Sequence, residues 1–263
     1  MEPLLNIAVR AARAASTILR RFQDNLDRIQ WNEKSKNDFI SEADKASEKV
    51  IIETIKSAYP DHAILAEESG LNGDEDAAVT WIIDPIDGTT NFIHGIPHFA
   101  ISIGVQIKGK IEHAVVYAPM NEELFTASRG AGAELNNHRL RVRKNNELEG
   151  TLLATGFPFK NHERLPLWQK TFDKLFAECA DIRRAGSAAL DLAYVASGRL
   201  DGFWEFDLKP WDIAAGSLLV QEAGGIVEDF TGNLKLLESG NVLAANPKVF
   251  KAMLQKIRTE LKA

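Results

Sequence analysis

The chain has 263 residues, of which 45% are hydrophobic and 26% are charged, so it is long enough to bury a sizeable core and has the composition of a globular protein. Its 31 basic and 37 acidic residues give a formal net charge of −6, which argues against a dedicated DNA-binding domain. A single cysteine excludes an internal disulfide, and no apolar run approaches the roughly 18 residues of a membrane span, so a cytoplasmic protein that does not enter a membrane is expected.

The first half of the chain is expected to fold as two helices followed by an antiparallel meander. Helical spacing predicts helices at 4–22 and 41–59, the second opening on a capping motif and ending before a proline. The polar segments 31–38 and 71–77 are expected to be loops. Short β-like runs, separated by glycine-containing turns, lie at 63–66, 81–83, 99–107, 111–117, 123–127 and 140–142.

The second half alternates strands and helices more regularly. Strands are expected at 151–155, 182–184, 202–206, 225–229 and 242–245. Helices are expected at 163–179, 187–197, 211–223 and 247–261. Interleaved helices and sheets predict an α/β (α+β) layered architecture. Since no repeat, low-complexity tract or linker interrupts the chain, we expect one domain over residues 1–263, with an α+β half over about 1–145 and an α/β half over about 146–263.

The stretch 81–91 combines residue types that chemistry on a phosphate needs. Its apolar first residues predict a buried strand, which Pro85 is expected to end because proline lacks a backbone donor. Asp84 and Asp87 then offer oxygen ligands of the kind that Mg²⁺ prefers. The alternative for this pair is a turn with two helix-capping aspartates.

Two further segments have the composition of a ligand-binding helix start. Gly88 permits a bend or a close ligand approach, and the hydroxyl and amide residues after it suit an N-cap whose free N–H groups bind an anion. Gly186, Ser187 and Ala188 would similarly let a polyol or a phosphate approach a second helix. The alternative for the second segment is an ordinary N-cap with close helix packing.

Two isolated acids, Glu67 and Asp212, complete the set of candidates. Glu67 follows a short apolar run, and Asp212 opens a helix rich in alanine and glycine. Carboxylates at strand ends and helix starts can converge on one point and share two metal ions. Taken singly, each of the two is also explained as a capping acid at a helix start.

These motifs together resemble the inositol monophosphatase family, most closely its bacterial SuhB-type members. The resemblance covers essentially the whole chain. It is carried by the upstream acid in 67–69 (EES), by 81–92 (WIIDPIDGTTNF), and by 211–216 (WDIAAG) with 222–225 (EAGG) after it. It implies an αβαβα sugar-phosphatase fold with metal sites between the layers.

The resemblance also implies a site that holds two to three Mg²⁺ ions. Carried over by position, the first ion would be held by Glu67, Asp84 and the carbonyl of Ile86. The second would be held by Asp84, Asp87 and Asp212, and Glu67 is also implied in a weaker third site. Asp84 would therefore bridge the first two ions.

Roles for the remaining residues follow from the same resemblance. Thr89 and Glu67 are implied in orienting the attacking water, with Asp44 supporting the Thr89 hydroxyl and Asp38 as a further polar group nearby. The backbone N–H groups of Gly88 and Thr89 would hold phosphate oxygens. The inositol hydroxyls would be lined by Asp87, Gly186, Ser187, Ala188, Glu205 and Asp212.

The activity implied is hydrolysis of myo-inositol 1-phosphate by metal-activated water, with sensitivity to Li⁺ and a homodimeric assembly. A second role implied for bacterial members is in transcription antitermination and ribosome biogenesis, through antitermination factors and RNA polymerase. Two alternatives stay open. The protein could be a related sugar- or nucleotide-phosphate phosphatase, or mainly a regulatory partner of RNA polymerase, with Arg183–Arg184 and the basic segment 139–144 as candidate surfaces.

Overall fold

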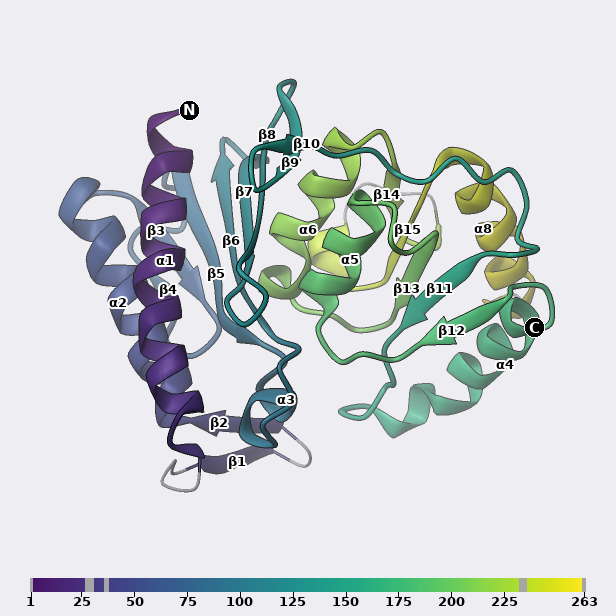
Figure 1. The fold of residues 1–263 in the computed structure, drawn as a ribbon, viewed down its shortest axis with the longest axis horizontal. Helices are drawn as coiled ribbons and strands as arrows, with labels where there is room; N and C mark the ends of the chain where they lie inside the picture. Colours follow the sequence, from purple (N-terminus) through teal and green to yellow (C-terminus); the bar gives the residue numbers. More distant parts are fainter. Residues whose placement is uncertain (1, 27–30, 36–37, 232–235, 262–263) are drawn as a thin grey trace.

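The computed structural model describes residues 2–26, 31–35, 38–231 and 236–261. Helices and sheets alternate in five layers across the molecule, which confirms the predicted layered α/β fold (Figure 1). The outer helices on one side are α1 (Pro3–Gln23) and α2 (Glu42–Ala58). The two sheets enclose α5 (Ala188–Ala196) and α6 (Pro210–Glu222), and the far side is covered by α4 (Leu165–Phe176) and α8 (Pro247–Leu261).

The larger sheet has eight strands in the order β10-β9-β8-β7-β6-β5-β3-β4. Its neighbours pair antiparallel except β3 with β5, which pair in parallel. The expected antiparallel meander is thus confirmed. The strands are β3 (Ala63–Ala66), β4 (Gly70–Asn72), β5 (Val79–Asp87), β6 (Ala100–Ile107), β7 (Lys110–Ala118), β8 (Glu123–Ser128), β9 (Gly132–Leu135) and β10 (His138–Arg139).

Three local expectations were wrong. The segment expected as a loop at 31–38 contains β1 (Trp31–Ser35), which pairs antiparallel with β2 (Asp38–Ser41) in a two-stranded ribbon, because backbone pairing does not require an apolar run. β4 likewise lies partly within the expected loop at 71–77 and pairs back onto β3. The expected strand at 140–142 is irregular: the Leu140 N–H donates to the Ala133 carbonyl of β9, but the Val142 N–H donates to the carbonyl of Ala223 at the C-terminal end of α6.

The smaller sheet has five strands in the order β12-β11-β13-β15-β14. Its strands are β11 (Leu152–Thr155), β12 (Asp181–Arg183), β13 (Gly202–Glu205), β14 (Ile226–Glu228) and β15 (Val242–Ala245). The helix expected at 163–179 is shorter in the structure. It is preceded by the 3-10 turn η2 (His162–Arg164), and α4 has a proline in its first turn, where the missing N–H costs nothing. Two short helices, α3 (Thr89–Ile93) and α7 (Leu236–Ser239), complete the described elements.

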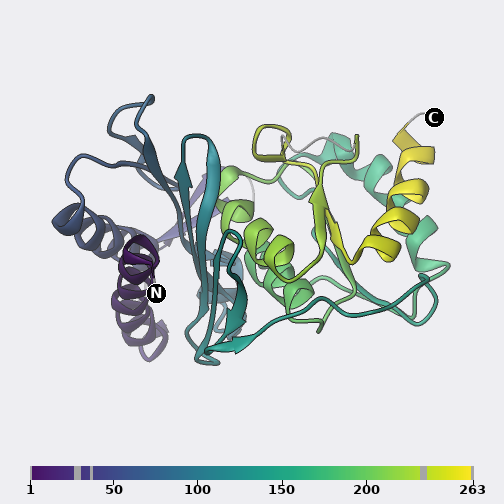
Figure 2. The ribbon, with the colours of Figure 1, turned by 90° about the horizontal axis from the view of Figure 1, so that it is seen from above.

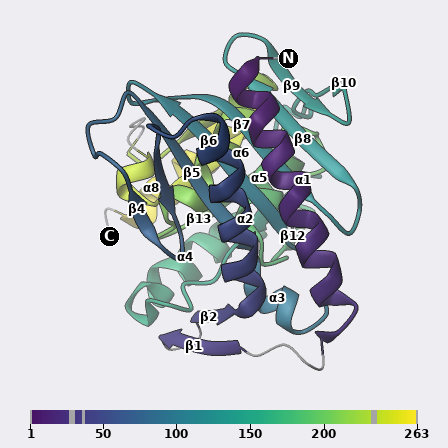
Figure 3. The same ribbon diagram turned by 90° about the vertical axis from the view of Figure 1, so that its left-hand side faces the viewer.

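Strand alternation determines which layer each side chain enters. Trp81 and Ile83 of β5 pack under α1 and α2, which lie across the outer face of the larger sheet (Figure 3), whereas Ile82 packs into the central layer. On β13, Phe203 faces the central layer and Trp204 faces α4 and α8. Because the side-chain period of a strand is two, Asp84 and Glu205 belong to the central side of their sheets. Each lies near the end of its strand, beside α5 and α6.

Seen from above, the five layers lie side by side, with the N-terminal helix and the C-terminal helix on opposite outer faces (Figure 2). Among the described residues, no helix has both the length and the apolar character needed to cross a membrane.

Candidate metal centre

The end of β5 brings two carboxylates onto one face through a bulge. The Asp84 to Asp87 step on β5 lies opposite the Ser102 to Ala100 step on β6, so β5 carries one extra residue there. In a regular strand a three-residue spacing would direct the two side chains to opposite faces, and the bulge removes that conflict. Pro85 lies inside the bulge, so the expectation that β5 stops at this proline was wrong. A proline is tolerated there because the ladder does not need its N–H.

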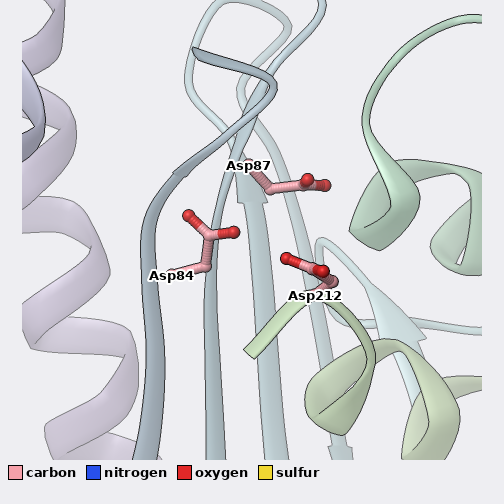
Figure 4. Close-up of side chains that lie close together, drawn as sticks. All are labelled: Asp84, Asp87 and Asp212. Carbon is pink, nitrogen blue, oxygen red and sulfur yellow. The ribbon is translucent and has the colours of Figure 1, made fainter. Parts of the chain in front are cut away.

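Asp212 approaches the same point from the first turn of α6. One of its oxygens, Oδ2, accepts a hydrogen bond of 2.7 Å from the Lys209 N–H, so the carboxylate also caps the helix. Capping occupies only one of its two oxygens. Oxygens of Asp84, Asp87 and Asp212 all lie within 4.8 Å of one another, and the three side chains face a common point (Figure 4).

Burial makes this group of acids difficult to ionise without a cation. It raises the pKa of Asp84 well above its usual value, with further increases from the charges of Glu67 and Asp87. It raises the pKa of Asp212 to about 8 and that of Asp87 to about 6. Three converging oxygen donors whose joint negative charge is costly fit a hard divalent cation such as Mg²⁺, which would remove that cost.

The N-terminus of α5 fixes Asp87. Its Oδ2 accepts hydrogen bonds from the Ser187 hydroxyl at 2.5 Å and from the Ala189 N–H at 2.7 Å. The Ser187 oxygen also accepts from the Leu190 N–H at 3.4 Å, as the N-cap of α5. The capping alternative for Ser187 is therefore observed, and the same hydroxyl positions the metal-centre carboxylate.

Glu67 enters the site from β3. Its N–H donates to the Ile83 carbonyl at 3.1 Å, which extends the parallel pairing of β3 with β5 to the point where β5 reaches Asp84. The charge of Glu67 raises the pKa of Asp84 and contributes to the raised pKa of Asp44. The structure thus places Glu67 beside the three aspartates.

Asp44 lies beneath the site as a fully buried acid of α2. Its Oδ2 accepts hydrogen bonds from the Ser41 N–H at 2.7 Å and from the Ser41 hydroxyl at 2.6 Å. The bond from the Ser41 N–H is one half of the capping box expected at this helix start, and in the other half the Ser41 side chain accepts from the backbone. Burial raises the pKa of Asp44 to about 6. Asp38 is the first residue of β2, and its side chain lies outside the described part of the chain.

Thr89 links Asp44 to the metal centre. Its hydroxyl lies 3.1 Å from Asp44 Oδ1 and 3.1 Å from the Ile86 carbonyl oxygen. A hydroxyl carries one hydrogen, and an ionised carboxylate is the stronger acceptor. When Asp44 is ionised, Thr89 therefore donates to Asp44 and keeps its oxygen lone pairs available to accept a hydrogen bond from water.

Gly88 shapes the turn between the bulge and α3. It is the N-cap of this short helix, so the expectation that the cap lies within 89–91 was wrong. Its φ of 102° is a conformation that side-chain-bearing residues rarely adopt. A Cβ here would also lie 3.2 Å from the Gly186 carbonyl oxygen. The two glycine segments therefore meet at one place.

Most of the candidate site residues line one cavity of about 160 Å³. All predicted site residues except Asp44 and Asp38 line it, namely Glu67, Asp84, Ile86, Asp87, Gly88, Thr89, Gly186, Ser187, Ala188, Glu205 and Asp212. Burial raises the pKa of Glu205 well above its usual value, and a Cβ on Gly156 would overlap its carboxylate. Glycine at position 156 is thus what makes room for Glu205.

Several residues of this cavity were not predicted from the sequence. Asp191 lies in its wall, and its only sequence signal is an acid inside the apolar helix 188–196, four residues after Ser187. Arg184, expected on a surface for RNA polymerase, is exposed and also lines the cavity, where its guanidinium lies 5.0 Å from the ring centroid of Phe157 and 5.7 Å from that of Phe159.

The similarity of this chain to known proteins extends over its whole length. The model of the inositol monophosphatase family matches residues 1–263. The Nus factor SuhB of Escherichia coli K12 is 57% identical over 261 residues, covering 99% of this chain and 98% of that protein. The crystal structure of extragenic suppressor protein suhB from Bartonella henselae superposes with a TM-score of 0.94 at 42% identity, covering 97% of this chain and 98% of that one.

A more distant neighbour contains a ligand. The structure of inositol monophosphate-bound SaIMPase-II, the inositol monophosphatase II of Staphylococcus aureus, superposes with a TM-score of 0.81 at 28% identity, covering 97% of this chain and 93% of that one. The match therefore extends over the same five layers and both sheets that build the cavity. By the family match and by the 57% identity to its bacterial relative, the chain belongs to the inositol monophosphatase family.

Proposed function

We propose that this protein is a Mg²⁺-dependent phosphomonoesterase that hydrolyses myo-inositol 1-phosphate to inositol and phosphate. The observation that carries the proposal is the convergence of Asp84, Asp87 and Asp212 within 4.8 Å. Thr89 and Glu67 line the same cavity. The inositol monophosphate bound to SaIMPase-II supports the choice of substrate, since that protein shares the fold and the family.

Two to three Mg²⁺ ions fit the donors of this cavity. Glu67, Asp84 and the Ile86 carbonyl would hold the first, and Asp84, Asp87 and Asp212 the second, with Glu67 also in a third site. The Ile86 carbonyl oxygen lies 3.1 Å from the Thr89 hydroxyl, and because the Thr89 proton is directed to Asp44, this oxygen keeps its lone pairs for a cation. When bound, Mg²⁺ supplies Lewis acidity that favours deprotonation of water and offsets negative charge on the leaving oxygen.

The chain itself orients the reacting groups. Thr89 accepts a hydrogen bond from the attacking water because its own proton is directed to Asp44, and Glu67 accepts the second. The first-turn N–H groups at Gly88 and Thr89, which have no partner within α3, donate to phosphate oxygens. No covalent phosphoenzyme is required, because water attacks the phosphorus directly.

Glu205 and the residues around the inositol ring orient the leaving group. Glu205 lies at the end of β13, where the missing side chain of Gly156 makes room for its carboxylate, and this carboxylate accepts a hydrogen bond from an inositol hydroxyl. The remaining contacts to the inositol ring come from Asp87, Gly186, Ser187, Ala188 and Asp212, all of which line the cavity.

Replacing Thr89 by valine is expected to lower kcat by about 10²-fold with little change in KM, because the water loses its acceptor while phosphate binding is kept. Thr89→Ser keeps the hydroxyl and should stay within about threefold of wild type. Steady-state phosphate release measures both. Equal losses in the two variants would mean that the methyl group, not the hydroxyl, is what the site requires.

The closest alternative is a related sugar- or nucleotide-phosphate phosphatase. A panel of myo-inositol 1-phosphate, fructose 1,6-bisphosphate, a nucleoside 3′-phosphate and histidinol phosphate, compared by kcat/KM with Mg²⁺ present, decides between them. The proposal expects myo-inositol 1-phosphate to rank first and Li⁺ to inhibit its hydrolysis. A higher rank for any other member would replace the substrate and keep the reaction type.

We further propose a role in transcription antitermination and ribosome biogenesis, through association with antitermination factors and RNA polymerase. The 57% identity to a protein named Nus factor SuhB favours it. Complementing a deletion strain with Asp87→Asn separates the two roles, because this change removes a metal ligand that lies inside the cavity. Full rescue would assign the cellular requirement to the regulatory role, and failed rescue would assign it to catalysis.

We also propose a cytoplasmic homodimer. Sedimentation at micromolar concentration tests the assembly, with a single dimeric species as the expected result and a monomer as the contradicting one.

A further inference from the structure

Asp191 is a buried acid in the cavity wall that the mechanism above does not use. It lies on α5 four residues after Ser187, the spacing that places two side chains on one helix face. Only 2% of the residue is exposed, and Asp191 is one of the residues that line the cavity. The other residues of α5 are alanine, leucine, tyrosine and valine, so an acid here is not explained by the packing of the helix.

No group in the described part of the chain donates a hydrogen bond to the Asp191 carboxylate. Buried carboxyl groups normally have such a partner, so the partner of Asp191 is expected to come from the cavity. Burial and the charge of Asp87 raise the pKa of Asp191 well above its usual value, and the charge of Arg184 opposes the rise.

Glu205 lines the same cavity as Asp191. After burial, the charge of Asp191 is the largest cause of the raised pKa of Glu205. Arg184 and Phe157 also line it, with the Arg184 guanidinium 5.0 Å from the Phe157 ring centroid. The cavity therefore offers two carboxyl groups, Asp191 and Glu205, that are not among the proposed metal ligands.

We infer that Asp191 is a specificity-determining residue, which together with Glu205 binds the hydroxyl groups of a polyol leaving group. The inference rests on the proposed phosphatase function and deepens it. The hydroxyls of a polyol can donate hydrogen bonds, and the carboxyl oxygens of Asp191 and Glu205 in the cavity lining can accept them. A leaving group without hydroxyls would leave Asp191 unpartnered and gain nothing from this wall.

Two substitutions separate this role from the others. Asp191→Leu removes the polar atoms at similar volume, and Asp191→Asn keeps an acceptor and a donor but no charge. Both are assayed with Mg²⁺ on myo-inositol 1-phosphate and on phenyl phosphate, whose leaving group offers no further hydroxyl. Asp191→Leu is expected to lower kcat/KM for the inositol ester by about ten- to a hundredfold, mainly by raising KM. The preference of the variant for the inositol ester over phenyl phosphate should fall by the same factor.

Asp191→Asn should stay within about threefold of wild type on both substrates, because its amide still pairs with hydroxyls. Asp201→Asn is the matched control. Asp201 is also 2% exposed, but it bonds Asn145 and the Leu152 N–H and does not line the cavity. This control should leave the substrate preference unchanged, and thermal unfolding checks that every variant is folded.

If folded Asp191→Leu kept the wild-type preference for myo-inositol 1-phosphate over phenyl phosphate, this inference would be overturned, and the proposed phosphatase function would stand. Equal losses in Asp191→Asn and Asp191→Leu, with a raised Mg²⁺ requirement, would overturn it in favour of a cation ligand. A wild-type protein that hydrolyses neither ester would overturn the proposed function, and this inference with it.

Discussion

Replacing Asp84 by asparagine is expected to lower kcat/KM for phosphate release by at least about 10³-fold, which corresponds to a loss of about 4 kcal/mol of transition-state stabilisation. Asp84 is the residue of the group that would bridge two metal ions. It is also the acid whose pKa is raised by the charges of three others, Glu67, Asp87 and Asp212. Removing its charge therefore weakens the binding of both ions at once.

The same substitution is expected to raise the thermal midpoint of the protein in chelator. The ionised Asp84 is disfavoured by burial and by its acidic neighbours, and asparagine removes that charge at nearly unchanged shape. Asp201→Asn provides the opposite case, since it weakens hydrogen bonds from Asn145 and the Leu152 N–H and should lower the midpoint. Calorimetry with chelator near neutral pH measures both. An active Asp84→Asn, or one that melts earlier than wild type, would contradict the assignment.

Without Mg²⁺, the buried acids of the site should make the protein less stable as the pH rises from about 4 to about 8. Burial raises the pKa of Asp44 and Asp87 to about 6 and that of Asp212 to about 8, against an ordinary value of 3.8. For a carboxyl whose pKa is raised on folding, the folded state binds the proton more tightly. Its stabilising effect is complete below the unfolded value and is lost as the pH rises through the folded value.

For Asp44 alone, the change in pKa from 3.8 to about 6 corresponds to about 3 kcal/mol between its two protonation states.

Urea unfolding of wild type and of Asp212→Asn, in chelator across this pH range, isolates the effect of the buried Asp212 carboxylate. The variant should gain stability relative to wild type as the pH rises. A difference that is independent of pH, or that grows toward acid pH, would contradict the burial account.

Mg²⁺ should reverse this trend. Carboxylates must lose their protons before they bind a cation, so added Mg²⁺ is expected to raise the melting temperature strongly near pH 8 and little near pH 5. Thermal scans with and without Mg²⁺ at both pH values test this directly. Ca²⁺ serves as a control for a general effect of divalent charge.

The sequence allowed the layer order and the convergence of acids to be predicted, because both follow from periodicity and from the residues that end each element. Trp81, Ile82 and Ile83 predict a strand buried on both faces, and Asp84 and Asp87 follow it directly. The same residues do not predict the bulge at 84–87. Whether a strand stops at Pro85 or continues past it depends on pairing with β6, which is a contact between residues distant in sequence.

The elements and residues that were missed share this dependence on tertiary contacts. β1 and β2 form a ribbon through backbone pairing, which leaves no apolar periodicity in the sequence. Asp191 appears as an isolated polar residue in an apolar helix until α5 is placed against the cavity. Arg184 follows a strand like any surface arginine, and only the position of Phe157 and Phe159 brings it to the cavity.

The central claim is that Asp84, Asp87 and Asp212 form a Mg²⁺-dependent phosphatase site, and release of inorganic phosphate from myo-inositol 1-phosphate tests it most directly. The account predicts release that rises with Mg²⁺ to saturation, stops in chelator, and returns when Mg²⁺ is added in excess. Undiminished release in chelator, or none at saturating Mg²⁺, would contradict it.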